Sequence, residues 1–432
     1  MKEESLRQSS LWMISGQGVS ILCQGLYFVL IGRALGSREY GAFVGVVALI
    51  AAFSQFSSLG MEMILVRNVS RDRASFAKTW GQALIIFSAG FFVLLAAAVL
   101  FAHFALPANL RGIVPWIALS DGLLGKFVQL ASRAFQGAGC LAWTARLSAL
   151  TNLCRTATAA AVWGWSRAHA VHPTAATWAR IYWLSSLTVA AIAGVVVTAQ
   201  LGLPRLARIR RSDLSQGLSF SLSGSSISVY NDIDKTFLVS CGQPRAAGIY
   251  SAAYRIVDAA TLPLYGIYAA AAPRFFREGA QSVARARDFS RRTLTRTLPY
   301  TAAVALLMAA AAPLLPLAFG PSFRESVEAL RWLCLLPVLR ALHYAWGSPI
   351  TGSASQWYRT ATQFGAAALN LALNFALIPR WSWRGAAAAS LLTDGTLALL
   401  SYLALQHLLR LEADANAAAR ALAPVGEEVS CP

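Results

Sequence analysis

Residues 81–103 of the chain, GQALIIFSAGFFVLLAAAVLFAH, decide its fold class. The stretch has no Asp, Glu, Lys or Arg. As a helix rising about 1.5 Å per residue, it is long enough to cross a hydrocarbon layer about 30 Å thick. A continuous apolar run excludes the alternating pattern of a membrane β-strand. Because lipid cannot satisfy backbone hydrogen-bonding groups, the stretch predicts a transmembrane α-helix.

The rest of the chain repeats this pattern. Hydrophobic residues make up 56% of the 432 residues and charged residues 13%, whereas soluble chains have about 25% charged residues. The predicted fold class is therefore all-α, a polytopic membrane protein with about twelve transmembrane helices. The predicted spans lie near residues 11–31, 41–63, 81–103, 113–130, 146–166, 176–199, 216–240, 247–272, 299–319, 327–349, 360–379 and 385–409.

The basic residues between the spans predict the orientation. Twenty-three of the 37 Lys and Arg residues fall near the membrane on the side of the N-terminus, and eight fall on the other side. By the positive-inside rule, both termini are expected to be cytoplasmic. The net charge of +18 is spread along these loops, so we expect it to contact anionic membrane lipids and not nucleic acid.

An Arg-rich connector divides the spans into two equal sets. The sequence predicts an N-terminal six-helix lobe (1–203), a cytoplasmic linker (204–215), a C-terminal six-helix lobe (216–410) and a disordered cytoplasmic tail (411–432). Six spans in each half leave the halves in the same orientation, which predicts pseudo-symmetry about the membrane normal.

Two hairpins carry a weak internal repeat. In each, one glycine follows a span and a second glycine, with an aromatic residue, opens the next: Gly36 and Gly41 in the first, Gly242 and Gly248 in the second. An offset near 207 residues is typical of duplicated bundles, although two glycines in tight interhelical turns also arise by chance. The stretches are FVLIGRALGSREYGAF (28–43) and FLVSCGQPRAAGIY (237–250).

Charged residues inside spans are costly and are functional candidates by default. Arg155 and Arg340 have no acidic residue within one helical turn, so an aqueous cavity that receives an anion such as phosphate explains them best. Arg255 with Asp258, and Asp232 with Lys235, are three residues apart, so each pair is explained equally well as a self-neutralising structural pair. The other charged candidates considered are Arg180, Arg331, Glu62, Asp121, Asp234 and Asp394.

Uncharged polar residues form stripes on two spans. Gln363, Asn370 and Asn374 return to nearly one face of the eleventh span, and Gln17 and Gln24 do the same on the first. Interhelical hydrogen bonding and the lining of a cavity explain these two stripes equally well. The seventh span is rich in serine and also carries Asn231, Asp232 and Asp234, so it must line water or be fully enclosed by protein.

Sequence motifs for catalysis are missing. The chain has no nucleotide-binding GxxxxGK[ST] loop, no HExxH and no GxSxG, and its five histidines and six cysteines are scattered. We therefore expect neither an enzyme, nor a cofactor, nor a metal site. A polysaccharide polymerase or ligase is the remaining enzymatic alternative, but the outer loops are too short for its chemistry.

The chain resembles the bacterial polysaccharide-transporter flippases, which move lipid-linked O-antigen or exopolysaccharide units and share a superfamily with multidrug exporters. The ordered set of degenerate motifs carries the resemblance: GRALGSREYGAF (32–43), LGMEMILVRNVSR (59–71), NDIDKTFL and GIYSAAYRI (within 231–256), and NLALNFALIPRWSWRGAAAAS (370–390). The sequence WSW (381–383) departs from the family's usual glycine-rich turn there.

The resemblance implies two lobes around a central cationic cavity and alternating access to the two sides of the bacterial inner membrane. It implies an undecaprenyl-pyrophosphate-linked oligosaccharide as substrate, with a polysaccharide polymerase and a chain-length regulator as further expected partners. An ion-coupled exporter of organic cations is the alternative. Asp234 and Arg255 match an acidic and a basic position of the family. The expected cavity residues are Arg155, Arg255, Arg340, Arg180, Lys235, Asn231, Asn370 and Asn374, and those expected to couple an ion are Asp234, Asp258 and Asp394.

Overall fold

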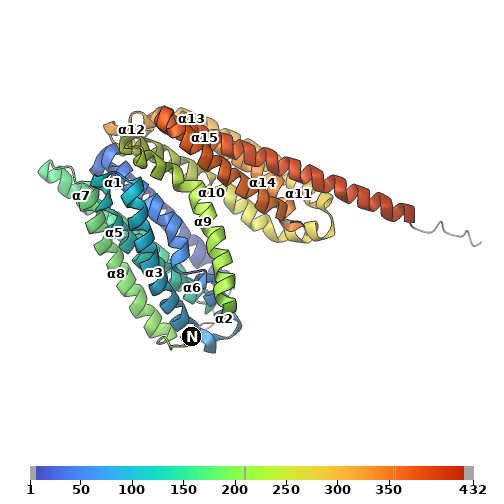
Figure 1. The fold of residues 1–432 in the computed structure, drawn as a ribbon, viewed down its shortest axis with the longest axis horizontal. Helices are drawn as coiled ribbons and strands as arrows, with labels where there is room; N and C mark the ends of the chain where they lie inside the picture. Colours follow the sequence, from blue (N-terminus) through green and yellow to red (C-terminus); the bar gives the residue numbers. More distant parts are fainter. Residues whose placement is uncertain (1–5, 209–210, 354, 356, 423–432) are drawn as a thin grey trace, which may run out of the picture. The chain divides into compact units, whose positions relative to one another are not determined.

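The structure, a computed structural model, describes residues 6–208, 211–353, 355 and 357–422. Within these ranges the secondary structure is helical, without a strand (Figure 1), which confirms the all-α fold class. The first elements are α1 (Leu6–Ser57), α2 (Met61–Arg71), η1 (Arg73–Ser75), α3 (Phe76–Ala105), α4 (Ala108–Arg111), α5 (Val114–Ile117), the π-helical η2 (Ala118–Gly125), α6 (Lys126–Gly137), α7 (Leu141–His169) and α8 (Ala175–Leu201).

The remaining elements bring the chain to residue 422. They are α9 (Arg211–Ser240), α10 (Pro244–Gln281), α11 (Val283–Ala311), η3 (Ala312–Leu314), α12 (Leu315–Phe319), η4 (Pro321–Phe323), α13 (Ser326–Leu333), α14 (Leu336–Gly352) and α15 (Trp357–Leu422). All twelve predicted spans fall on helical segments, two of them on each of the long elements α1 and α15.

Two backbone breaks divide these long elements. Gly36 interrupts α1 with φ 70°, and Ser382 interrupts α15 with φ 56°. Ser382 is the centre of the WSW sequence, so the chain makes its turn there with a serine in the left-handed region, where glycine is usual. Trp383 on one side of the break is buried, whereas Trp381 on the other is exposed.

Hydropathy separates the more apolar helices from the others. In the part of the chain that the structure describes, six helical stretches are long and apolar enough to cross a membrane. The rest carry polar residues that lower their mean hydropathy, such as Arg155 in α7 and Asp234 in α9. The six are Gln17–Ser57, Arg73–Ala105, Ala108–Gly137, Ala175–Leu201, Val283–Phe319 and Trp357–Ala418.

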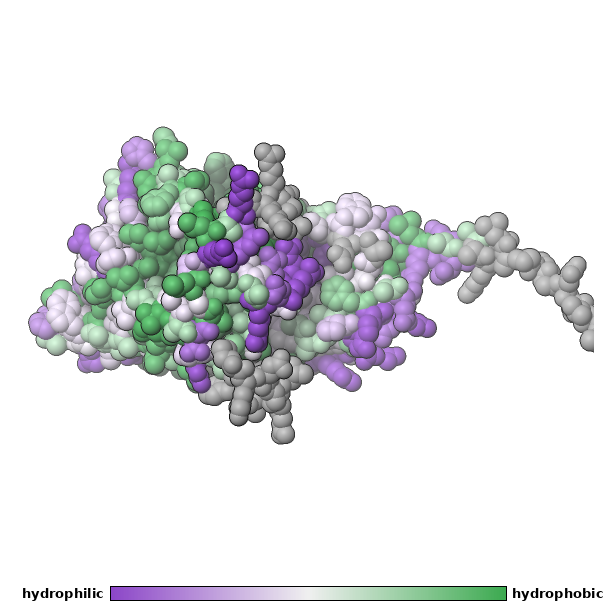
Figure 2. Space-filling view, turned by 90° about the horizontal axis from the view of Figure 1, so that it is seen from below, coloured by the Kyte–Doolittle hydropathy of each residue, from purple (hydrophilic) through white to green (hydrophobic). Residues whose placement is uncertain are grey.

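The surface is apolar where a soluble protein would be polar. Phe92 and Phe104 on α3 are 68% and 80% exposed, and Figure 2 shows hydrophobic side chains over much of the visible face. A soluble protein rarely exposes so much contiguous apolar surface. The exposed face of α3 is therefore suited to lipid.

The backbone groups into two compact units. Unit 1 comprises Met1–Ala253, Ala312–Ala329 and Leu373–Ala386, and unit 2 comprises Tyr254–Ala311, Leu330–Ala372 and Ala387–Pro432. This grouping by proximity does not test the predicted six-and-six division, which stays a prediction. In unit 1, α2, α3, α6, α7 and α8 share one hydrophobic core that includes Leu65, Trp80 and Phe135. In unit 2, Tyr268 and Phe275 pack with Ala341 and Ala345.

The tail predicted to be disordered is partly ordered. Residues 411–422 continue α15, because the sequence LEADANAAARAL consists mainly of strong helix formers and lacks Gly and Pro. The remainder of that tail, residues 423–432, and most of the serine side chains predicted to line the seventh span lie outside the described residues.

Candidate functional site

Arg155 has an acidic partner that its own helix does not provide. Its Nη2 lies 2.9 Å from Oδ1 of Asp121, and the Tyr182 hydroxyl donates to the same oxygen at 2.6 Å. The guanidinium also lies 5.0 Å from the centre of the Tyr182 ring. The expectation of an unpaired Arg155 was therefore wrong, because helix packing brings α7 and α8 to the π-helical η2, which carries Asp121.

A polar pocket of about 510 Å³ opens beside this ion pair, entirely within unit 1. Its walls come mainly from α6 and α7 and consist of amide, hydroxyl and basic side chains. In a segment that spans a membrane such a lining indicates water or a polar ligand. The pocket is lined by Gln24, Asp121, Gly125, Lys126, Val128, Gln129, Ser132, Arg133, Gln136, Thr144, Ser148, Thr151, Asn152 and Arg155.

Two side chains on the α7 wall donate within the protein and keep an oxygen that can accept. The Thr151 hydroxyl donates to the Leu147 carbonyl at 2.8 Å, and the Asn152 amide donates to the Ser148 carbonyl at 3.1 Å. Each side chain keeps an oxygen that can accept. The α7 wall therefore presents acceptors to a hydroxyl-rich ligand.

Basic side chains accompany these acceptors. Lys126 is buried, and its Nζ donates to Gln55 at 3.2 Å and lies 3.4 Å from Glu62. Arg133 donates to Gln136 at 2.7 Å. With Arg155, the lining has three basic residues, and Asp121 and Glu62 pair with two of them, which leaves one net positive charge.

Sequence reasoning found Arg155, Asp121 and Gln24 but missed the other polar residues that line this pocket. Thr144, Ser148, Thr151, Asn152 and Arg155 follow one another at helical spacing along one face of α7. A second set on α6, namely Gln129, Ser132, Arg133 and Gln136, repeats the spacing. The signal that could have found the pocket was this periodicity of weakly polar residues, which the search for intramembrane charges passed over.

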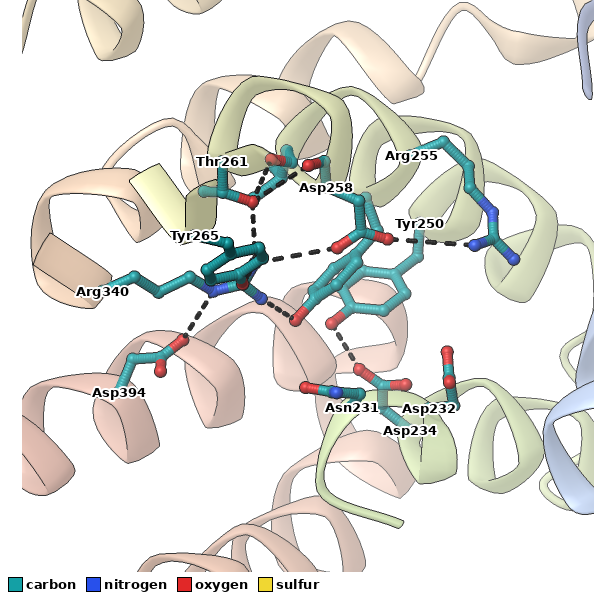
Figure 3. Close-up of polar contacts among 12 residues, drawn as sticks. Asn231, Asp232, Asp234, Tyr250, Arg255, Asp258, Thr261, Tyr265, Arg340 and Asp394 are labelled. Carbon is teal, nitrogen blue, oxygen red and sulfur yellow. Dashed lines mark hydrogen bonds and ion pairs between the residues drawn. The ribbon is translucent and has the colours of Figure 1, made fainter. Parts of the chain in front are cut away.

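Arg340 lies in a cluster of polar side chains in unit 2, where it contacts several hydroxyl and carboxylate groups (Figure 3). Only 4% of Arg340 is exposed. Its Nη2 donates to the Tyr254 hydroxyl at 2.6 Å, and its Nη1 donates to the hydroxyls of Tyr265 at 2.9 Å and Thr261 at 3.3 Å. The side chain is thus held by α10 from several directions.

Two carboxylates neutralise this cluster, so the expectation of an unpaired Arg340 was wrong. Asp394 lies 3.7 Å from Nε of Arg340, and Asp258 lies 3.7 Å from Nη1. Asp258 also lies 3.8 Å from Arg255, its predicted neighbour on the same helix face. Two arginines against two aspartates make the cluster neutral. This favours the structural interpretation of these four residues over direct contact with an anion.

A third set of charges lies at the end of α9 in unit 1. Asp232 and Lys235 form the predicted ion pair, and Lys235 also donates to the Asn231 carbonyl at 3.3 Å. Asp234 is 3% exposed and accepts from the Tyr250 hydroxyl and from the Lys235 amide. The bond from Tyr250 links Asp234 on α9 to the start of α10, whereas the buried Lys235 bonds within α9.

The other predicted cavity residues have separate environments. Asn370 is buried and donates to the Thr393 hydroxyl at 3.3 Å, a contact between the two halves of α15 that favours the interhelical interpretation of its stripe. Asn374 is fully buried, and Arg180 is exposed on α8. The predicted residues thus fall into three contact sets and some positions outside those sets, and their roles stay predictions.

The fold is similar to that of solved transporter structures. A multidrug resistance MATE-family transporter of the MOP superfamily in an inward-facing conformation has a TM-score of 0.71 at 14% identity, covering 92% of this chain and 96% of that one. Its outward-facing counterpart gives 0.61 at 14% identity, covering 94% and 96%. A MOP-superfamily transporter from Pyrococcus furiosus gives 0.60 at 14% identity, covering 95% and 97%.

Among curated proteins, none matches the sequence. A family model described as polysaccharide biosynthesis protein matches residues 6–278, a range that contains the whole lining of the polar pocket. That range is well over half of the chain, and this multi-pass membrane protein therefore belongs to the polysaccharide biosynthesis protein family.

Proposed function

We propose that the protein is a flippase. It moves an oligosaccharide linked to undecaprenyl pyrophosphate, the repeat unit of an O-antigen or exopolysaccharide, from the cytoplasmic to the periplasmic leaflet of a bacterial inner membrane. The observation that carries this proposal is the polar pocket of unit 1, about 510 Å³ in volume. The family and the transporter fold support it.

The pocket suits the two chemical parts of such a substrate. Sugar hydroxyls both donate and accept hydrogen bonds, and the amides and hydroxyls of α6 and α7 offer matching groups. The pyrophosphate is anionic, and the excess of basic side chains would offset part of its cost of leaving water, which is many kcal/mol in a low-dielectric medium. The polyprenyl tail needs no pocket because it stays in lipid.

Arg155 is the residue best placed to contact the pyrophosphate. Its guanidinium has five donors, and Asp121 accepts from one nitrogen. Asp121 and Tyr182 hold the guanidinium in one orientation, so little side-chain entropy is lost when an anion binds. The carboxylate also competes with the anion, which keeps binding weak enough for release.

Release of the substrate and return of the empty transporter require alternating access and a source of energy. The chain has no nucleotide-binding motif, so the membrane gradient or consumption of the substrate outside must drive transport. Asp234, Asp258 and Asp394 are the carboxylates proposed to couple an ion. We place both termini in the cytoplasm, with the polymerase and chain-length regulator as partners on the periplasmic side.

Export of an organic cation is the second candidate, because the similar solved structures include multidrug resistance transporters. A cation site needs exposed carboxylates. In the polar pocket the only acidic lining residue is Asp121, and it is paired with Arg155. The pocket chemistry therefore favours the anionic substrate.

The test is transport of a fluorescent undecaprenyl-pyrophosphate oligosaccharide by the full-length protein in liposomes, followed as accessibility at the outer leaflet. We expect Arg155→Ala to lower the initial rate at least tenfold. Arg167→Ala removes the same charge from the exposed end of α7 and should leave the rate unchanged. If the wild type moves no lipid-linked sugar but accumulates an organic cation against a proton gradient, the cation exporter replaces the flippase.

A further inference from the structure

Unit 2 contains a second pocket, about 360 Å³ in volume, whose character differs from that of the polar pocket. Five of its eleven lining residues are aromatic: Tyr265, Tyr268, Phe275, Phe276 and Tyr344. Tyr344 packs against both Tyr265 and Tyr268, with ring centroids 5.5 Å and 5.4 Å apart. Its volume lies within the range of pockets that bind small ligands.

One basic residue lines this aromatic pocket. Arg359, near the N-terminus of α15, is half-buried, and within the described residues no Asp or Glu forms an ion pair with it. Arg340 in the same unit, by contrast, has Asp258 and Asp394. A partly buried guanidinium without a carboxylate is costly unless an anion neutralises it.

Glycine creates the space that Arg359 occupies. The guanidinium lies directly over Gly347 of α14, where a Cβ would overlap Nη1 of Arg359. A side chain at 347 would displace the guanidinium from its present position. The position of Arg359 thus depends on a specific contact between two helices and is not that of a freely moving surface side chain.

The side chains of the aromatic pocket indicate which chemical group is attached to the anion. Aromatic and aliphatic side chains favour hydrocarbon, and Phe276 is 48% exposed, so the wall continues to the outer surface of the unit. The positive-inside count puts Arg359 at the cytoplasmic end of its span, the depth at which lipid phosphates lie. Guanidinium binds phosphate with two parallel hydrogen bonds.

We propose that this pocket binds the phosphate group of an anionic lipid, with Arg359 contacting the phosphate and the aromatic wall contacting the hydrocarbon. The phosphate belongs either to a membrane phospholipid or to a polyprenyl phosphate, which present the same chemistry. The aromatic pocket shares no lining residue with the polar pocket. This proposal does not rest on the identity of the transported substrate.

Binding of defined lipids to the purified full-length protein in neutral detergent tests the proposal. The probes are phosphatidylglycerol, polyprenyl monophosphate, inorganic phosphate and zwitterionic phosphatidylcholine, with native mass spectrometry as the readout. We expect Arg359→Gln to weaken binding of the anionic lipids about tenfold. Arg410→Gln removes a charge from an exposed position of the same helix and should bind as the wild type does.

The probes distinguish the sources of the phosphate. Tighter binding of polyprenyl monophosphate than of phosphatidylglycerol assigns the site to the polyprenyl lipid, and the reverse assigns it to a phospholipid. Competition by inorganic phosphate supports recognition through the phosphate itself. Equal binding of phosphatidylcholine, or an equal loss in Arg410→Gln, overturns the proposal.

A second variant keeps the positive charge of Arg359 but changes the position of its guanidinium. Gly347→Ala should displace the guanidinium and weaken anionic-lipid binding several-fold, whereas Gly365→Ala, where a Cβ meets no atom within 4 Å, should not. This comparison remains available if Arg359→Gln does not fold. Wild-type affinity in Gly347→Ala overturns the proposal in that case.

Discussion

Gly41 and Gly248 pack against each other in a reciprocal contact within unit 1. A Cβ on Gly41 would overlap the Pro244 carbonyl oxygen, and a Cβ on Gly248 would overlap the Ser37 carbonyl oxygen. Each glycine thus faces the residue four positions before the other. Close approach of two backbones through small residues is the usual way in which membrane helices associate.

The contact relates the two hairpins that repeat in the sequence. Gly41 and Gly248 are 207 positions apart, as are Ser37 and Pro244. The glycine that precedes each contact also has matching backbone geometry, with φ 70° at Gly36 and 72° at Gly242. Chance placement of glycines does not account for a reciprocal contact, so the repeat has a structural basis in local two-fold pairing.

A side chain at this contact should destabilise the protein. Gly41→Ala places a methyl group against backbone atoms that cannot rotate away, and overpacking of this kind costs about 1–3 kcal/mol. We expect a lower midpoint of thermal unfolding in detergent. Gly25→Ala on α1 before the break at Gly36, where a Cβ meets nothing within 4 Å, is the control and should unfold as the wild type does. Equal midpoints for the two variants would show that the contact is not tight.

The spans and the local ion pairs could be predicted because their signals are short-range. A run of apolar residues defines a span, and Asp232 with Lys235 is visible from a spacing of three residues. The pairing of Arg155 with Asp121 joins positions 34 residues apart, across a π-helical segment that changes the register of the helix. Hydropathy carries no information about which helices pack together.

The candidate site could not be predicted fully for the same reason, because the sequence does not show which helices pack together. Arg340 was expected to face a cavity because its own helix provides no acid, but Asp394 comes from α15 and Asp258 from α10. Conversely, the residues that line the polar pocket, such as Ser148 and Asn152, carry no charge and did not stand out from ordinary helix-packing residues. Only their position on one wall with Arg155 distinguishes them.

The Arg340 cluster should contribute to stability more than to transport. Arg340→Ala removes the guanidinium that faces the buried Asp394, and breaking a buried ion pair costs about 3–5 kcal/mol. We expect a large fall in the midpoint of thermal unfolding, which Arg331→Ala at an exposed position should not cause. A variant that keeps its wild-type midpoint but loses transport would instead assign Arg340 to the substrate path.

Cys241 provides a test of the membrane orientation. It is exposed between α9 and α10, a connector predicted to be periplasmic, and partial desolvation raises the pKa of the Cys241 thiol. In a variant that keeps only this cysteine, a membrane-impermeant maleimide should label intact cells from outside. The raised pKa means less thiolate at neutral pH, so labelling should accelerate as pH rises. Labelling only of inverted vesicles would reverse the predicted orientation.

Asp121 should weaken substrate binding while Arg155 strengthens it. If the guanidinium contacts the pyrophosphate, Asp121→Asn removes a competing negative charge from the polar pocket and leaves a side chain of the same shape beside Tyr182. We expect several-fold tighter binding of an undecaprenyl-pyrophosphate oligosaccharide, together with slower transport because release becomes limiting. Binding is measured in detergent and transport in liposomes, with the exposed Asp72→Asn as the control. Weaker binding in Asp121→Asn would mean that the carboxylate mainly positions Arg155, and a change of similar size in Asp72→Asn would mean that net charge alone determines affinity.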